Sequence, residues 1–138
     1  MKNELVTFET AKLADKAGFD WEVYAAYNKN NEELEDLSDI YHYACEGGME
    51  LDEWFGNYNS KSWKSLISAP TQSLLQRWLR EVHNIHVEVI CNNIVTKLYT
   101  CEITAMHFEK ITKTFKSFEE ALEEGLKQSL KRILNEKK

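Results

Sequence analysis

The clearest pattern along the chain is a repeat of apolar residues every three or four positions, the spacing of a helix with one buried face. It predicts three helices, over about 7–17, 70–84 and 118–134. The second helix carries the stripe Leu74, Leu75, Trp78, Leu79 and Val82, and the third carries Phe118, Leu122, Leu126, Leu130 and Ile133. Beside the third stripe, the small residues Ala121, Gly125 and Ser129 predict close approach to a sheet or another helix.

Residues that favour helix ends stand at the ends of all three segments. Thr7 can cap the first helix, and Gly18 follows it as a left-handed terminator, so Phe19 should fold back onto the helix end. Pro70 suits the first turn of the second helix, and Asn84 can end that helix in a left-handed conformation. Ser117 and Glu120 form the capping box of the third.

Shorter segments show the alternation or the residue types of strands. Residues 21–27 are rich in β-formers and end at an asparagine-rich turn over 28–31. Residues 85–89 alternate strictly, and 97–103 form a second strand, so a hairpin is expected over about 85–103 with its turn at 91–93. A short extended piece is expected at 108–111.

The stretch from 32 to 66 is less regular. It suggests a short helix at 34–41, a break at Gly47-Gly48, and an aromatic-anchored loop in which Trp54 and Trp63 pack back onto the domain. The whole pattern predicts an α+β fold, with an antiparallel sheet packed by about three amphipathic helices in two layers. No linker or repeat divides the chain, so we expect a single domain over 1–138 with an acidic excursion at 32–66.

Composition excludes several classes of protein. The chain of 138 residues is 43% hydrophobic and includes four Trp, six Tyr and six Phe, which is globular rather than disordered composition. No apolar run approaches the length of a membrane span, so no membrane partner is expected. The first residues lack the apolar core of a secretory signal, and three irregularly placed Cys form no disulfide framework, so a reduced, cytoplasmic location is expected.

Charge is unevenly distributed along the chain. Nine acidic residues and no Lys or Arg lie between Glu32 and Glu53. Residues 1–53 carry four basic and fourteen acidic groups, whereas 54–138 carry thirteen basic and nine acidic groups. The acidic stretch is typical of a solvated face, and it also suits a docking surface for a basic partner.

Motifs of known chemistry are absent from the sequence. It has no nucleophile elbow, no phosphate-binding loop and no EF-hand spacing, and neither Cys91 nor Cys101 lies in a catalytic motif. The pair His83 and His86 straddles a helix end and a strand, so it does not present one metal-binding face; His42-x-x-Cys45 has the same weakness. We therefore expect no enzyme activity, no metal and no cofactor.

The helix over 70–84 carries long polar side chains that folding alone does not explain. Gln72, Gln76, Arg77 and Arg80 lie mainly off its apolar stripe and are the candidate binding residues. Gln and Arg read bases, so this helix could enter a DNA groove. Nucleic acid is nevertheless the less favoured partner, because the pI is about 5.3 and phosphate neutralisation supplies most DNA affinity.

The chain shows a resemblance to a known group of proteins over about half of its length. Two segments carry it: residues 68–87, SAPTQSLLQRWLREVHNIHV, and residues 117–126, SFEEALEEGL. They resemble segments P-T-Q-S-x-x-Q-[RK]-W-L-R-E and S-[FY]-E-E-A-L-E-x-G-L of small uncharacterised proteins from phages and prophage-like regions of Bacteroides-type gut bacteria. The resemblance implies a phage or mobile-element accessory protein and implies no activity. We expect a non-catalytic module that binds a protein partner; the alternatives are a nucleic-acid-binding protein that uses the 70–84 helix and an acidic DNA mimic that inhibits a basic host protein.

Overall fold

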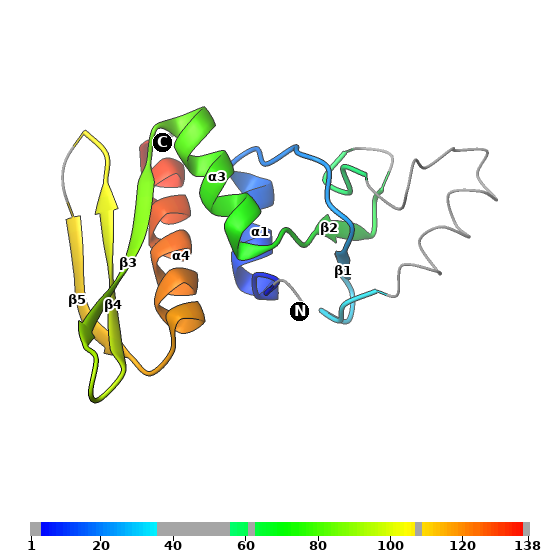
Figure 1. Cartoon of the computed structure of the whole chain (residues 1–138). Coiled ribbons are helices and arrows are strands. Elements are labelled where there is room, and N and C mark those ends of the chain that lie inside the picture. The colour runs from blue at the N-terminus through cyan, green and yellow to red at the C-terminus, as the bar shows by residue number, and fades with distance from the viewer. Residues whose placement is uncertain (1–3, 36–55, 61–62, 107–108, 137–138) are drawn as a thin grey trace. The chain divides into compact units, whose positions relative to one another are not determined.

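The computed structural model describes residues 4–35, 56–60, 63–106 and 109–136. Its contacts divide the chain into two compact units, Leu5–Pro70 and a unit of Met1–Glu4 with Thr71–Lys138. Within the described residues there are three helices and two small antiparallel sheets (Figure 1). The predicted α+β class is therefore confirmed.

The first helix, α1 (Phe8–Lys16), begins and ends as its sequence predicts. The Thr7 hydroxyl accepts a hydrogen bond from the Thr10 N–H. Gly18 has a φ of 96°, and the N–H groups of Gly18 and Phe19 donate to the carbonyls of Asp15 and Ala14. These two bonds form a Schellman motif, which folds the buried Phe19 back onto the helix end.

The strand expected at 21–27 is wrong in extent. Regular pairing occurs only between β1 (Ala26–Asn28) and β2 (Leu66–Ser68), and Val23 forms an isolated bridge to Gly56. A strand extends only as far as its partner supplies hydrogen bonds, and β2 is three residues long. The partner β2 was not predicted; it lies at the junction between the irregular stretch, which ends at residue 66, and the start of the second helix.

Asparagine side chains form the turn after β1, as expected. Asn28 Oδ1 accepts from the Asn30 N–H at 2.8 Å, and Asn31 Oδ1 accepts from the Glu33 N–H at 2.9 Å. The chain then returns beside β1 through a bridge from Leu34 to Tyr27. The rest of the helix expected at 34–41 lies outside the described residues, as do Gly47-Gly48 and Trp54.

Trp63 packs back onto its unit, which confirms that part of the prediction. Its ring lies edge-on to Tyr58, with centroids 5.2 Å apart, and Tyr58 is fully buried. Asn59 anchors the same segment, because its amide donates to the Phe19 carbonyl and its oxygen accepts from the Ser68 N–H.

The second unit contains the predicted hairpin in an antiparallel sheet of order β3-β4-β5, formed by β3 (His86–Asn93), β4 (Leu98–Thr104) and β5 (Glu109–Phe115). The turn expected at 91–93 is wrong, because those residues continue β3. The chain turns at 94–97, where Asn93 Oδ1 accepts from two turn N–H groups and Lys97 has a φ of 55°. The extended piece expected at 108–111 is the longer strand β5.

Helix α4 (Phe118–Glu136) covers one face of this sheet, with α3 (Gln72–His83) packed against α4 and β3 (Figure 1). Ser117 Oγ accepts from the Glu120 N–H at 3.1 Å, which confirms the cap. The apolar stripe of α4 is buried except at Phe118, which is 47% exposed in the first turn, with its ring edge-on to Tyr99. The small-residue strip is buried, and Gly125 lies directly over Cys101 and Val87.

None of the helices that the structure describes combines the length and apolar character that a bilayer crossing requires.

Candidate functional site

Helix α3 carries all four candidate residues, and its own sequence positions it. The Thr71 hydroxyl accepts from the Leu74 N–H at 3.1 Å at the start, so Pro70 precedes the cap and does not lie in the first turn as expected. At the end, Asn84, with a φ of 54°, donates its N–H to the Leu79 carbonyl. Leu75, Trp78 and Leu79 form the buried side of the helix. The opposite side therefore faces solvent, and it is the side to examine for binding.

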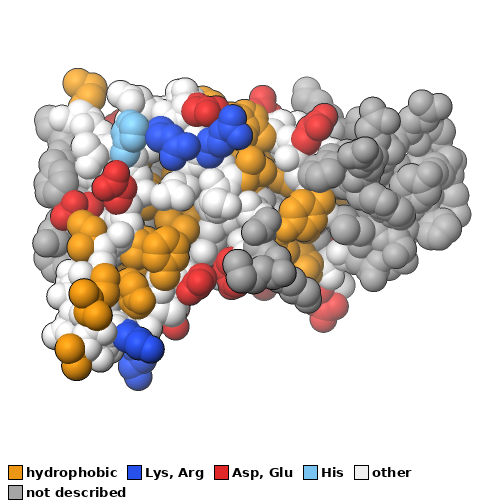
Figure 2. Space-filling view, in the orientation of Figure 1, with side chains coloured by type: hydrophobic (Ala, Val, Ile, Leu, Met, Phe, Trp, Pro, Cys, Tyr) orange, Lys and Arg blue, Asp and Glu red, His pale blue; other side chains and the backbone are white. Residues whose placement is uncertain are grey.

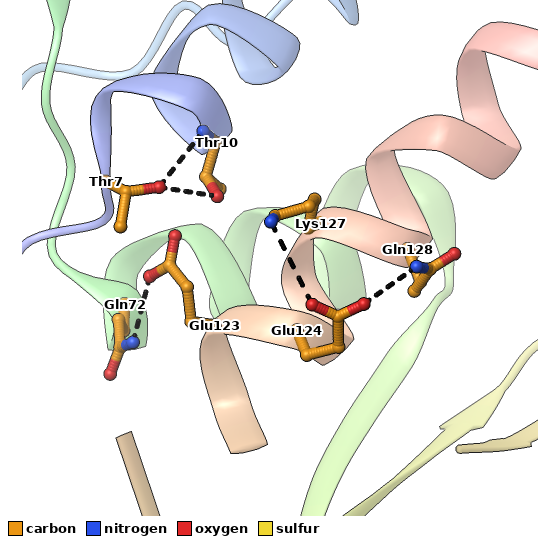
Figure 3. A network of polar contacts seen from close by, with 7 residues as sticks. All are labelled: Thr7, Thr10, Gln72, Glu123, Glu124, Lys127 and Gln128. Carbon is orange, nitrogen blue, oxygen red and sulfur yellow. Dashed lines mark hydrogen bonds and ion pairs between the residues drawn. The ribbon is translucent and has the colours of Figure 1, made fainter. Parts of the chain in front are cut away.

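Gln72 does not lie on that open side. It is 5% exposed, and its Nε2 donates to the Glu119 carbonyl at 2.9 Å and to Glu123 Oε1 at 3.0 Å. Figure 3 shows its amide pointing to the Glu123 carboxylate. A buried amide with both donors used ties α3 to α4.

Gln76 also bonds within its unit. Its Nε2 donates to the Val87 carbonyl at 2.6 Å, on the edge strand β3. A carbonyl at a sheet edge has no strand partner on that side, so the Gln76 amide supplies the missing donor. Both glutamines therefore have a structural role: Gln72 bonds α3 to α4, and Gln76 bonds α3 to β3.

Arg77 and Arg80 remain on the exposed side of α3. Arg77 Nε lies 2.9 Å from Glu81 Oε1, one helical turn further on, and both side chains are largely exposed. Arg80 is exposed and forms no ion pair or hydrogen bond with any residue in the described part of the chain. Figure 2 shows basic side chains beside one another over this helix. In the Arg77–Glu81 ion pair the two charges cancel, so the net positive charge of this surface comes from Arg80.

Val82 is a residue of α3 whose burial the sequence pattern predicted wrongly. It was expected in the buried stripe with Trp78 and Leu79, but it is 53% exposed. It lies in the last turn of α3, beyond the part of the helix that contributes buried side chains. Val82 lies seven residues after Leu75 and so on the same side of the helix, whereas Arg77, Arg80 and Glu81 lie on the opposite side. We call Arg77, Arg80 and Glu81 the outer face of α3.

His83 and His86 make separate local contacts. The His83 ring lies edge-on to Trp78, with centroids 4.7 Å apart, whereas His86 Nε2 shares a 3.1 Å hydrogen bond with Asn84 Oδ1. Among the residues that the structure places, no three or more His, Cys, Asp or Glu side chains gather as a metal site would require. His42 and Cys45 lie outside the described residues.

Cys91 is exposed on β3, and Cys101 is fully buried on β4. Burial raises the pKa of the Cys101 thiol to about 11, and the carboxylates of Glu102 and Glu124 add to the rise. A thiol with this pKa stays protonated at neutral pH, so Cys101 serves packing rather than nucleophilic chemistry.

Comparisons of the chain with protein-family models, curated proteins and solved structures found no match.

Proposed function

We propose that this protein is a non-catalytic protein-interaction module, an accessory protein of a phage or mobile element, as the resemblance of its two motifs suggests. The observation that supports it is the outer face of α3, where the exposed Arg80 has no partner among the described residues. Arginine is enriched at protein interfaces and among the residues that dominate binding energy.

The structure narrows which of the four candidate residues can contact a partner. Gln72 and Gln76 use their amides on Glu119, Glu123 and Val87. Recognition is therefore assigned to Arg77 and Arg80, with Glu81 beside them on the same side of the helix. The mixture of both charges fits a protein surface.

Nucleic-acid binding is the alternative that this face supports less. Glu81 forms an ion pair with Arg77, and a carboxylate on the outer face of α3 repels the phosphates of a nucleic acid. The other alternative, an acidic mimic of DNA, depends on the stretch from Glu32 to Glu53, most of which lies outside the described residues.

The test is capture from infected or lysogenic bacterial cells with the tagged full chain, quantified by mass spectrometry. We expect an Arg77→Ala, Arg80→Ala double variant to lose the protein that the wild type retains. Lys131→Ala, which removes an exposed cation from α4, is the matched control and should retain it.

Equal retention by all variants would exclude the outer face of α3 as the binding surface. Absence of any specifically retained protein would overturn the proposed function. Binding of a DNA duplex that weakens steeply with salt and with the double variant would favour the nucleic-acid alternative instead.

A further inference from the structure

Two adjacent aliphatic side chains protrude from the turn between β3 and β4. Ile94 is 84% exposed and Val95 is 90% exposed, although both are residue types that proteins usually bury. The turn is formed by hydrogen bonds from backbone N–H groups to Asn93, so the two side chains have no role in holding it. Their exposure therefore needs another explanation.

Sheet register brings further residues to the same end. Asn93 pairs with Leu98 next to the turn, and Tyr99 pairs with Phe115 at the end of β5. Phe118 lies edge-on to Tyr99 and is half exposed. The end of the sheet thus presents an aliphatic tip with aromatic rings behind it.

Three lysines lie toward the same end of the sheet as this apolar tip. Lys97 lies in the turn, Lys113 holds its Nζ 5.5 Å from the Phe115 ring centroid, and Lys116 follows β5. All three are exposed, and none forms an ion pair with another residue whose placement the structure gives. We call Ile94, Val95, Lys97, Lys113, Lys116 and Phe118 the hairpin end. Figure 2 shows lysine and hydrophobic side chains together at this end of the sheet.

We propose that the hairpin end binds the surface of an anionic lipid bilayer. A convex aliphatic tip can enter the boundary between headgroups and acyl chains, while lysine stems bury their methylenes and keep the ammonium groups among anionic headgroups. A protein partner fits less well, because protein interfaces are depleted in lysine and are centred on aromatic and arginine anchors.

This contact needs no membrane-spanning helix. The expectation of no membrane partner came from the missing apolar run, which concerns spans alone. The contact also lies away from the outer face of α3 and goes beyond the proposed function. Glu119 and Glu120, exposed in the first turn of α4, oppose it, and their removal therefore provides a test of opposite sign.

The experiment is flotation of the full chain with phosphatidylcholine vesicles, with and without phosphatidylglycerol. We expect binding to the anionic vesicles only, with a loss at high salt. Each of Lys97→Gln, Lys113→Gln and Lys116→Gln should weaken partition about fivefold, since a lysine near an anionic surface contributes on the order of 1 kcal/mol. Ile94→Ser with Val95→Ser should weaken it by more than about tenfold.

Matched controls lie elsewhere on the same unit. Met106→Ser removes an apolar side chain that is 96% exposed between β4 and β5, and Lys131→Gln removes an exposed cation of α4. Both should bind as the wild type does, and Glu119→Gln with Glu120→Gln should bind more tightly. Circular dichroism melts verify that each variant folds.

Absence of wild-type binding to the anionic vesicles would overturn the proposal, as would equal losses in the Met106 and Lys131 controls. Capture of a protein that depends on the hairpin end, without vesicle binding, would assign the surface to a protein instead. None of these outcomes bears on the outer face of α3, so the two proposals fail separately.

Discussion

At the scale of single residues, Gly125 shows why one position in a helix can decide how closely a helix and a sheet approach. A Cβ at this position would lie 2.7 Å from Val87 Cγ1 and even closer to Cys101 Sγ. Glycine costs a helix about 1 kcal/mol relative to alanine, so its presence here reflects the lack of space rather than helix propensity.

Gly125→Ala should therefore destabilise the protein by about 1–3 kcal/mol despite the gain in helix propensity, because overpacking outweighs it. Urea unfolding measures the difference. Cys101→Ala in the same chain should recover part of the loss, since it removes the nearest obstructing atom. A Gly125→Ala chain as stable as the wild type would show that α4 shifts without cost.

Gln72 provides a second test at this scale, because its amide is the donor for two acceptors on α4. Gln72→Glu would put a carboxylate against the Glu119 carbonyl and the Glu123 carboxylate, and it should cost about 1–3 kcal/mol. Gln72→Leu should cost less at neutral pH, because it adds no charge.

The difference between these two variants should shrink toward about pH 4, where a protonated glutamic acid can donate again. Equal unfolding free energies for the two variants at neutral pH would contradict the donor role of Gln72.

Burial of Cys101 predicts a loss of stability in alkali. The folded chain keeps the thiol proton up to about pH 11, whereas the unfolded chain releases it near pH 9. The unfolded state therefore binds fewer protons between these values, and stability falls as pH rises through them, by about 2 kcal/mol. Burial also raises the pKa of Tyr58, which acts in the same direction.

Cys101→Ala isolates the contribution of the thiol. Denaturant melts across this pH range should show a shallower loss in Cys101→Ala than in the wild type, while Cys91→Ala keeps the wild-type slope. Identical slopes in all three proteins would mean that Cys101 titrates normally in the fold.

At the scale of elements, α4 is the part that its own pattern predicts best. Leu122, Leu126, Leu130 and Ile133 are all buried as the four- and three-residue spacing requires. Phe118, the first member of the stripe, departs from it because a residue in the first turn extends past the end of the sheet contact. Val82, in the last turn of α3, departs for a similar reason.

Leu126→Ala should cost about 2–5 kcal/mol, because the side chain is fully buried and its removal leaves a cavity. Phe118→Ala is the control from the same stripe and should cost clearly less, since the ring is half exposed. Denaturant melts of both variants measure the loss of unfolding free energy. A loss below about 0.5 kcal/mol in Leu126→Ala would place the stripe on the surface.

Strands were predicted less well than helices, and the reason is their dependence on partners. The alternation at 85–89 identifies a strand, but β3 continues to Asn93 because β4 pairs with it along that length. Conversely, the β-formers at 21–27 form a regular strand only at β1, where β2 pairs with them. The local sequence of a strand does not indicate how far its partner strand extends.

At the scale of the whole molecule, metal binding can be tested on the chain as purified. The contacts of His83 and His86 point to different neighbours, Trp78 and Asn84. We therefore expect elemental analysis to find no stoichiometric zinc, both before and after incubation with zinc and removal of the excess. One tightly bound zinc per chain would overturn this prediction and revive catalytic alternatives.

The candidate site was only partly accessible to sequence reasoning. The sequence identified the helix and its polar side chains, but it could not separate Gln72 and Gln76, which bond to α4 and β3, from Arg77 and Arg80, which face solvent. Long polar side chains at a helix flank reach either water or a neighbouring element, and only the neighbour's position decides which. The single-domain organisation, the phage origin and the role of the acidic stretch stay predictions.

The sequence by itself determined the α+β class, the three helices, both ends of α1, the start of α4, the left-handed end of α3, and the hairpin, because these depend on periodicity and on interactions within a few residues. The tertiary structure alone decided the pairing of β1 with β2, the place of the hairpin turn and the exposure of Phe118 and Val82. It also decided which candidate residues remain available to a partner. Each of these features depends on which segment, distant in the sequence, packs against the residue or strand concerned. A local pattern of apolar and polar residues does not specify such contacts.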